Sequence, residues 1–290
     1  MTRKFMRSIV IWLAGMGMLT LAVSGVVRKT QRTVGRLETV ELLPLAAKAD
    51  AAGDLDEART LYESILGYTP ESRVALLGSA RVAFQQGRFT EALTRCNTSL
   101  AIAGPESGFD EQLLRGNLLL ALGRFAEATN AYRSAASAKP TAPEPHWGIA
   151  QAAEAACDYA TMRDALNAVS KLDFASASRA YREHRERLQQ TIDAAGRSIL
   201  GADPSAQGYY TMASALRDSG RWTEAMDAFA KSSELPGSPA DSWFWLGAGA
   251  MADGDAERAR RQLNRAVEAT PHHRAALRAL QRLDDHQDPT

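Results

Sequence analysis

The sequence predicts an all-α protein, a solenoid of antiparallel helix hairpins preceded by a single transmembrane helix. Three observations lead to this prediction. A short turn phrase recurs along the chain at a nearly constant spacing, an uncharged stretch of 20 residues lies near the N-terminus, and alanine occupies many positions that a compact core would give to larger side chains. Small side chains let neighbouring helices approach closely, which suits a stack of hairpins.

The composition is that of a folded protein without an excess of either charge. Apolar residues make up 45% of the chain and charged residues 23%, which excludes a disordered chain. The 34 basic residues balance the 34 acidic residues, whereas a nucleic-acid-binding domain usually carries a clear basic excess. We therefore expect no nucleic acid among the partners.

The N-terminal stretch divides into a short basic tail (1–7), an uncharged segment (8–27) and a juxtamembrane linker (28–38). As a helix rising ~1.5 Å per residue, the uncharged segment spans about 30 Å, the thickness of the hydrocarbon core of a bilayer. Trp12 lies near its first boundary, where tryptophan commonly anchors a membrane helix. The segment is therefore predicted to be a membrane anchor. The alternative is a signal peptide cut after Ser24, but the apolar run is longer than the ~7–15 residues of a signal-peptide core.

Basic residues on both sides of this segment leave its orientation nearly balanced. Three basic side chains and the α-amino group precede it, and four basic side chains, from Arg28 to Arg36, follow it. A short, strongly charged tail resists translocation, so we expect the repeats outside the cytoplasm. Frequent alanine and arginine suggest a high-GC bacterium, which would place the anchor in the inner membrane and the repeats in the periplasm.

Six segments share one phrase, in which a turn residue precedes a charged residue and the start of a helix. The turn residues are Gly53, Gly87, Gly123, Cys157, Gly220 and Gly254, at spacings of 34, 36, 34, 63 and 34 residues. Glycine accepts the left-handed conformation that ends many helices. Proline cannot continue a helix, and it closes several units, at Pro70, Pro105, Pro140 and Pro271. Each unit is therefore predicted to be a helix, a tight turn and a second helix.

Two positions of the second helix predict how the hairpins pack. A small alanine follows the turn in five units and lets the two helices approach closely: Ala58, Ala92, Ala128, Ala225 and Ala259. Four residues later comes a larger side chain, which we expect to pack between neighbouring hairpins: Tyr62, Cys96, Tyr132, Phe229 and Leu263.

The period of about 34 residues resembles that of the tetratricopeptide repeat. The last full unit also carries Trp243-Phe244-Trp245-Leu246-Gly247, close to the W-x-x-L-G phrase of that family. The resemblance holds over six units in one register. It implies a right-handed superhelical solenoid, whose concave wall is lined by the first helix of each unit, and a role in binding other proteins.

The predicted organisation is four repeats (39–174), an irregular helical insert or degenerate repeat (175–205), two further repeats (206–271), and a capping helix with a tail (272–290). The fourth unit departs from the pattern, with Cys157 where glycine is usual and Met162 where alanine is usual. Its 63-residue spacing to the fifth unit exceeds one period by 29 residues. A degenerate repeat with a nearly continuous helix is the preferred account of that excess.

In this family the residue ten positions before the turn residue faces the concave groove, together with residues four and seven positions after it. The candidate partner-binding residues are Leu43, Leu77, Arg81, Phe84, Leu113, Asn117, Leu120, Trp147, Gln151, Glu154, Tyr210, Ser214, Arg217 and Phe244. An apolar floor with scattered polar groups suits a helix or an extended peptide. The competing interpretation is that the apolar members only pack against the neighbouring hairpin.

Three more specific kinds of site, a carboxylate clamp, a basic patch and a metal site, have little support in the sequence. The carboxylate clamp of some tetratricopeptide chaperone partners needs neighbouring lysines, and here only Arg81 and Asn117 stand at such positions. The arginines of residues 179–187 alternate with glutamates, as on a solvated helix face. His272 and His273 are adjacent, so on a helix they point about 100° apart, and no third ligand lies one turn away.

No catalytic or cofactor-binding motif is present: the sequence has no G-x-S-x-G, no HExxH, no P-loop and no dinucleotide fingerprint. Cys96 and Cys157 are far apart and are expected to act as small hydrophobes. We therefore expect no enzyme, no metal, no cofactor and no small-molecule substrate. The predicted function is a membrane-anchored scaffold or adaptor that assists assembly of a membrane or envelope complex. The alternative is a permanent structural accessory subunit of such a complex.

Overall fold

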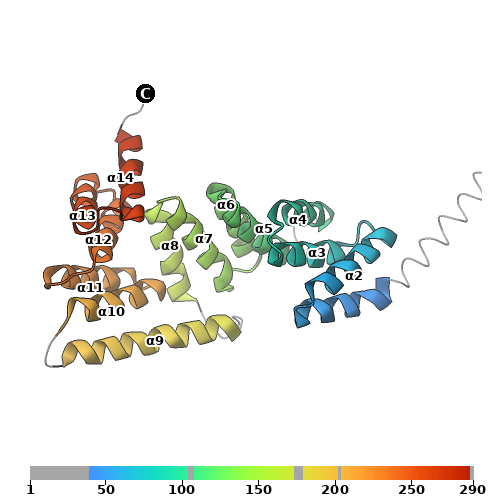
Figure 1. Cartoon of the computed structure of the whole chain (residues 1–290), viewed down its shortest axis with the longest axis horizontal. Helices are drawn as coiled ribbons and strands as arrows, with labels where there is room; N and C mark the ends of the chain where they lie inside the picture. The colour runs from blue at the N-terminus through green and yellow to red at the C-terminus, as the bar shows by residue number, and fades with distance from the viewer. Residues whose placement is uncertain (1–38, 104–107, 173–178, 202–203, 288–290) are drawn as a thin grey trace, which may run out of the picture. The chain divides into compact units, whose positions relative to one another are not determined.

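The computed structural model describes residues 39–103, 108–172, 179–201 and 204–287. Within these ranges every regular element is an α-helix, and the helices alternate with short turns (Figure 1). The chain divides into two compact units, residues 1–105 and 106–290. The predicted anchor, residues 8–27, lies outside the described residues. None of the helices described is long and apolar enough to cross a bilayer.

The described residues of the first unit form two hairpins. A helix at residues 39–52 pairs with α2 (Leu55–Tyr68), and α3 (Arg73–Gln85) pairs with α4 (Phe89–Ala103). The turn residues Gly53 and Gly87 have left-handed φ angles of 82° and 74°, as the turn phrase predicts. Alanines and larger apolar side chains fill the space between the helices, with Ala46, Ala49, Ala58, Tyr62 and Ile65 all buried.

Tyr62 joins the two hairpins of this unit. Its side chain is 2% exposed, and its ring lies directly against the backbone of α3 at Gly78. A Cβ added to Gly78 would lie 2.3 Å from Cζ of the ring, a distance that no packed side chain reaches. The predicted role of Tyr62 between neighbouring hairpins is confirmed.

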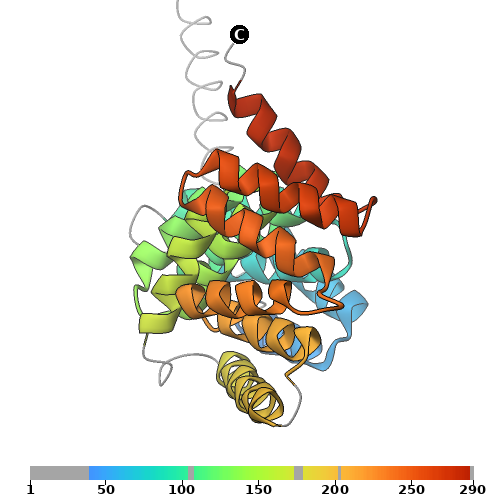
Figure 2. The ribbon, with the colours of Figure 1, turned by 90° about the vertical axis from the view of Figure 1, so that its left-hand side faces the viewer.

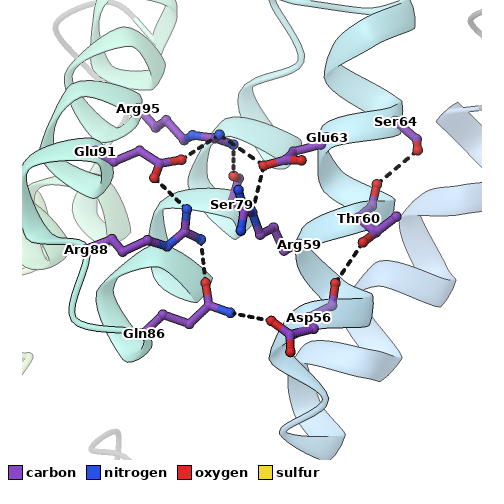
Figure 3. A network of polar contacts seen from close by, with 10 residues as sticks. All are labelled: Asp56, Arg59, Thr60, Glu63, Ser64, Ser79, Gln86, Arg88, Glu91 and Arg95. Atoms are coloured by element: carbon purple, nitrogen blue, oxygen red, sulfur yellow. Dashed lines mark hydrogen bonds and ion pairs between the residues drawn. The ribbon is translucent and has the colours of Figure 1, made fainter.

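A charged network connects α2, α3 and α4 (Figure 3). Arg95 lies 2.7 Å from Glu91 and 3.5 Å from Glu63. Arg59 donates to Glu63 at 2.9 Å, and this hydrogen bond holds the pKa of Glu63 below its ordinary value. The network also includes Arg88, Gln86, Asp56 and Ser79, so that three arginines face three carboxylates. Exposed pairs contribute at most ~1 kcal/mol each, so the main effect of the network is to leave no basic group of this surface unmatched.

In the second unit, the residues that the structure describes form four hairpins, one long helix and a final helix. The hairpins are α5 (Phe109–Ala121) with α6 (Phe125–Ala138), α7 (Pro143–Ala155) with α8 (Tyr159–Lys171), α10 (Ala206–Asp218) with α11 (Trp222–Glu234), and α12 (Ala240–Ala252) with α13 (Ala256–Ala269). The long helix is α9 (Arg179–Leu200), and the final helix, α14 (Arg274–Gln287), packs beside α13 (Figure 2).

Tyr132 repeats in this unit the arrangement of Tyr62. Its ring lies between Gly116 of α5 and Gly148 of α7, where an added Cβ would approach the ring to 2.5 Å and 2.4 Å. The equivalent residues Phe229 and Leu263 are fully buried as well. The prediction that this position packs the array is therefore confirmed in both units.

Cys157 ends α7 in the left-handed conformation, with a φ angle of 56°. Among the described residues it is the one non-glycine residue with a positive φ. The turn keeps its hydrogen bonds: the Cys157 N–H donates to the Glu154 carbonyl at 3.0 Å, and the Asp158 N–H donates to the Ala153 carbonyl at 2.8 Å. The departure in sequence thus leaves the turn geometry unchanged and places a side chain where the other turns have none.

The 175–205 segment, predicted as an insert or degenerate repeat, contains α9, a single helix of 22 residues that packs along α10 (Figure 1). α9 does not separate α8 from the later hairpins. Arg163 of α8 donates to the Ala252 carbonyl at the end of α12 at 3.0 Å. The α10–α11 turn also fits against α8, because a Cβ on Gly220 would lie 2.2 Å from the Leu166 carbonyl oxygen. The two later hairpins therefore pack directly on the fourth.

Candidate partner-binding surface

The fourteen side chains predicted to line a partner-binding groove all lie on the first helices of the hairpins. Those helices are residues 39–52, α3, α5, α7, α10 and α12. In α3, α5, α7 and α10 the candidates are spaced by four and then three residues, so they share one face of each helix, and the other two helices carry one candidate each. Their exposure differs: Arg81, Gln151 and Glu154 are exposed, Phe244 is buried, and the other ten are half-buried.

In the first unit this face combines an ion pair with apolar packing. Arg81 Nη2 lies 3.2 Å from Asp50 Oδ2, and the side chain of Arg81 is 51% exposed while that of Asp50 is 11% exposed. Leu43 packs against the core, and Phe84 contacts Phe89 with their ring centroids 5.7 Å apart. Arg81 is thus the group that this face offers to solvent, and its guanidinium has further N–H donors beyond the one used on Asp50.

On α5 the polar candidate is held by the packing tyrosine. The Tyr132 hydroxyl donates a 2.7 Å hydrogen bond to Asn117 Oδ1. Burial raises the pKa of Tyr132, which keeps the hydroxyl protonated as a donor. Leu113 and Leu120, on the same face, are half-buried. Asn117 therefore has a structural partner already, whatever else it contacts.

Trp147 of α7 contacts α9. Its ring meets the ring of His184 edge-on, with centroids 5.6 Å apart. Val169 and Tyr181 complete this apolar corner, and burial raises the pKa of Tyr181 to about 12. A signal for this contact exists in the sequence, since Tyr181, His184 and Leu188 recur at helical spacing on one face of α9. The chain itself thus packs on a ring that the repeat register predicts to contact a partner.

Gln151 and Glu154 are the exposed polar residues of α7. Neighbouring helices crowd Glu154, and the resulting loss of hydration raises its pKa, while Arg217 and Arg278 act in the opposite direction. Glu154 therefore lies within electrostatic reach of α10 and α14. The charges around it are of both signs, because Asp218 of α10 raises its pKa as well.

Tyr210 and Phe244 belong to a cluster that fastens the last helix. The Tyr210 hydroxyl donates to Asp241 Oδ2 at 3.4 Å, and His273 Nε2 lies 2.9 Å from Asp241 Oδ1. Nδ1 of His273 accepts a 3.2 Å hydrogen bond from the Ala276 N–H in the first turn of α14. Phe244 is 4% exposed, with its ring 5.2 Å from the His273 ring. The sequence indicates no role for His273 beyond a rejected metal site. In the structure its side chain caps the N-terminus of α14.

Arg217 of α10 is engaged on two sides. Its guanidinium lies 4.0 Å from the centre of the Trp245 ring and 2.6 Å from Asp218. Stacking of this kind holds a guanidinium in place while leaving its edge able to donate. Ser214, one turn earlier, is half-buried. No three His, Cys, Asp or Glu side chains of the described ranges are grouped so as to hold a metal ion.

Two sequence models of the tetratricopeptide repeat match the chain, one over residues 51–107 and the other over residues 113–171 and 210–274. Together they cover more than half of the chain. The chain belongs to the tetratricopeptide repeat family. Tetratricopeptide repeats generally mediate protein–protein interaction, and their fold is typically a non-catalytic scaffold. The matched ranges leave out the N-terminal stretch and α9.

The chain is also similar to several solved structures, at low sequence identity and with TM-scores below 0.5. A tetratricopeptide repeat protein of Parabacteroides merdae is 17% identical, with 86% of this chain and 99% of that chain covered and a TM-score of 0.45. PilF of Pseudomonas aeruginosa is 14% identical, with 89% and 99% covered and a TM-score of 0.43. TTC0263 of Thermus thermophilus is 18% identical, with 72% and 97% covered and a TM-score of 0.42. No curated protein sequence is significantly similar to the chain.

Among the candidate residues of the tetratricopeptide first-helix face, the exposed ones are polar. Its apolar members Trp147 and Phe244 contact other parts of the chain, whereas Arg81, Gln151 and Glu154 are exposed. These three lie four or seven residues after the position that the family's geometry directs at the groove. We refer to Arg81, Gln151 and Glu154 as the polar triplet.

Proposed function

We propose that this chain is a membrane-anchored interaction scaffold that binds a partner protein or peptide on its first-helix face and assists assembly of a membrane or envelope complex. The observation that carries the proposal is the exposure of the polar triplet on that face. The guanidinium of Arg81 in the first unit, and the amide of Gln151 and the carboxylate of Glu154 in the second, each offer donors or acceptors to a bound peptide.

The uncharged segment at residues 8–27 supports a single-pass anchor. The basic tail of residues 1–7 favours a cytoplasmic N-terminus, which would put the repeats in the periplasm of a bacterium. A C-terminal alkaline phosphatase fusion tests the orientation, because that enzyme becomes active only after export. An inactive phosphatase fusion together with a fluorescent cytoplasmic reporter fusion would refute the periplasmic location.

Site-specific photo-crosslinking in membranes tests the binding face. A photoreactive phenylalanine analogue at position 81 or 151 should capture the partner. The same analogue at position 133 of α6 or 227 of α11, both exposed on second helices, should not. Capture from the second helices alone would refute the proposed face.

A charge-neutral variant tests whether the polar triplet contributes to affinity. The variant R81Q/Q151A/E154Q removes one charge of each sign, and N130A/R133Q/D227N does the same on exposed second-helix positions. The first variant should lose the captured partner, and the second should keep it. Both should melt within a few degrees of the unmodified chain, because no buried group is changed.

The accessory-subunit alternative is favoured by apolar exposure in the first unit. Val40, Leu45, Tyr68 and Val74 are 66%, 52%, 50% and 62% exposed. Large exposed hydrophobic residues are common at permanent interfaces. Purification in mild detergent distinguishes the two functions. A permanent subunit co-purifies at fixed stoichiometry and survives loss of the polar triplet, whereas a scaffold releases its partner when the triplet is removed.

A further inference from the structure

Three positions of the second helices, at 4, 7 and 11 residues after the turn residue, are exposed in every unit with a turn glycine except at the half-buried Glu91. Five units have a turn glycine. In α2, α4, α6, α11 and α13 respectively, these positions hold Glu57, Thr60 and Ser64; Glu91, Thr94 and Thr98; Glu127, Asn130 and Ser134; Glu224, Asp227 and Lys231; and Arg258, Arg261 and Arg265. Acidic, hydroxyl, amide and lysine side chains are therefore all compatible with the scaffold at these positions. The three arginines of α13 are not a requirement of the repeat.

Arg258, Arg261 and Arg265, which we term the arginine stripe, lie on one face of α13. Their spacing of three and then four residues aligns them along the helix over about 10 Å. All three are exposed. The guanidinium of Arg265 lies 4.8 Å from the centre of the Trp243 ring, which restricts its motion while leaving its N–H groups outward.

Arginines at the start of other second helices have acidic partners within the chain. Arg124 pairs with Glu127 at 2.7 Å and Arg221 pairs with Glu224 at 2.5 Å. In the last hairpin the charges are exchanged. Asp255 stands directly after the turn glycine, and its carboxylate caps α13 by accepting from the Arg258 N–H at 2.9 Å.

The ion pairs around α13 leave the stripe unmatched. The other arginine of the helix, Arg260, lies 2.7 Å from Asp284 of α14. In the part of the chain that the structure describes, none of the three stripe arginines has a carboxylate within ion-pair distance. The stripe is therefore a row of guanidinium groups with donors available to an external acceptor.

We infer that the arginine stripe is a docking surface for an acidic segment of a partner protein. A guanidinium matches a carboxylate in shape and can donate two parallel hydrogen bonds to it. Glu257 and Glu268 flank the stripe and are exposed. A narrow acidic segment can follow the three arginines without contacting these glutamates, whereas a broad anionic surface would be repelled by them. The surface is separate from the first-helix face and does not depend on the function proposed for that face.

Titration with a defined peptide tests this inference on the full-length chain. The probe is a fluorescein-labelled helical peptide with glutamates three and four residues apart, and its counterpart has glutamine in place of glutamate. The stripe variant is R258Q/R261Q/R265Q. The control, R59Q/R124Q/R221Q, removes the same charge from arginines that already have acidic partners.

The unmodified chain should bind the glutamate peptide in preference to the glutamine peptide, and more weakly at higher salt. The stripe variant should bind at least about tenfold more weakly, and the control within about twofold of the unmodified chain. A third variant, R258K/R261K/R265K, keeps the positive charges but lacks the planar guanidinium groups. Its affinity for the glutamate peptide should lie between those of the stripe variant and the unmodified chain. This variant also provides the test if the glutamine variant does not fold. The triplet variant R81Q/Q151A/E154Q should bind the peptide normally.

Equal loss in the stripe and control variants would overturn the inference, because binding would then follow net charge alone. So would equal affinity of the unmodified chain for the two peptides. Vesicles containing anionic phosphatidylglycerol provide the remaining arm. If the stripe variant loses vesicle binding while the peptide binds neither protein, the stripe contacts a lipid surface and the acidic-segment inference fails.

Discussion

Replacing Gly220 with alanine tests whether α8 packs against the α10–α11 turn, and Gly123 provides a matched reference. Both glycines have left-handed φ angles, 82° and 73°, and each donates its N–H to a carbonyl of the preceding helix, at 2.9 Å and 3.0 Å. They differ in their surroundings. An added Cβ at Gly123 meets no atom within 4 Å, whereas at Gly220 it would lie 2.2 Å from the Leu166 carbonyl oxygen and 2.9 Å from Ser170 Cβ.

The magnitudes follow from these two environments. A left-handed alanine costs ~1–2 kcal/mol, and its stiffer unfolded chain offsets ~0.4–1 kcal/mol of that. Gly123→Ala should therefore lower the free energy of unfolding by ~1 kcal/mol. Gly220→Ala incurs the same conformational cost and also forces the turn away from α8, which adds ~1–3 kcal/mol, typical of overpacking. We expect a total loss of about 3 kcal/mol.

Urea unfolding at a fixed temperature, followed by helical circular dichroism, measures both variants. A second substitution, Ser170→Gly, should restore little in the Gly220→Ala background, because the nearest atom to the new Cβ belongs to the backbone. Equal losses in the two alanine variants, within ~0.5 kcal/mol, would show that α8 does not rest on this turn in solution. No loss at Gly123 would refute the left-handed argument itself.

Three further predictions concern single side chains. Cys157→Gly removes the Cβ from a residue whose φ angle is 56°, and it should raise the free energy of unfolding by ~0.5–1 kcal/mol. Cys157→Ala keeps the Cβ and should give no gain in the same urea titration. Equal effects of the two substitutions would show that the Cβ of Cys157 causes no backbone strain. His273→Ala removes the cap of α14 and the contact with Asp241, so the free energy of unfolding should fall by ~1–2 kcal/mol. A double-mutant cycle with Asp241→Ala should show a coupling energy above ~0.5 kcal/mol, and simple additivity would contradict the contact. Burial lowers the pKa of His146 below its ordinary 6.5, so the unfolded chain binds the proton more readily and the free energy of unfolding falls as the pH drops below 6.5. The His146→Gln variant should therefore lose less stability than the unmodified chain between about pH 7 and pH 5. An identical loss in both proteins would contradict this.

The hairpins and their packing could be predicted because their signals are local. Five of the six turn phrases combine a glycine, which suits the left-handed conformation, with a nearby alanine. The residue four positions after that alanine is buried where the hairpins meet, as at Tyr62 and Tyr132. Cys157 shows that the register of neighbouring units also carries information, since it adopts the glycine conformation that its position predicts.

The availability of the candidate site could not be predicted in the same way. Trp147 and Phe244 stand at the same register position as Leu77, yet Trp147 contacts His184 of α9 and Phe244 lies beside His273 of the last helix. Their contacts come from segments outside the repeat pattern, so no periodic rule locates them. Binding by the first-helix face remains a prediction.

The contact between α8 and the end of α12 has a consequence for how the second unit opens. In an array where each repeat touches only its neighbours, stability is nearly additive and the ends fray independently. Here Arg163 and the carbonyl of Ala252 meet across a sequence separation of 89 residues. The hairpins that follow α9 cannot detach without uncovering α8, so amide hydrogens of α8 and α12 should exchange with solvent in one cooperative step. Closing so long a loop before this contact forms should also make the assembly of these helices the slow step in folding.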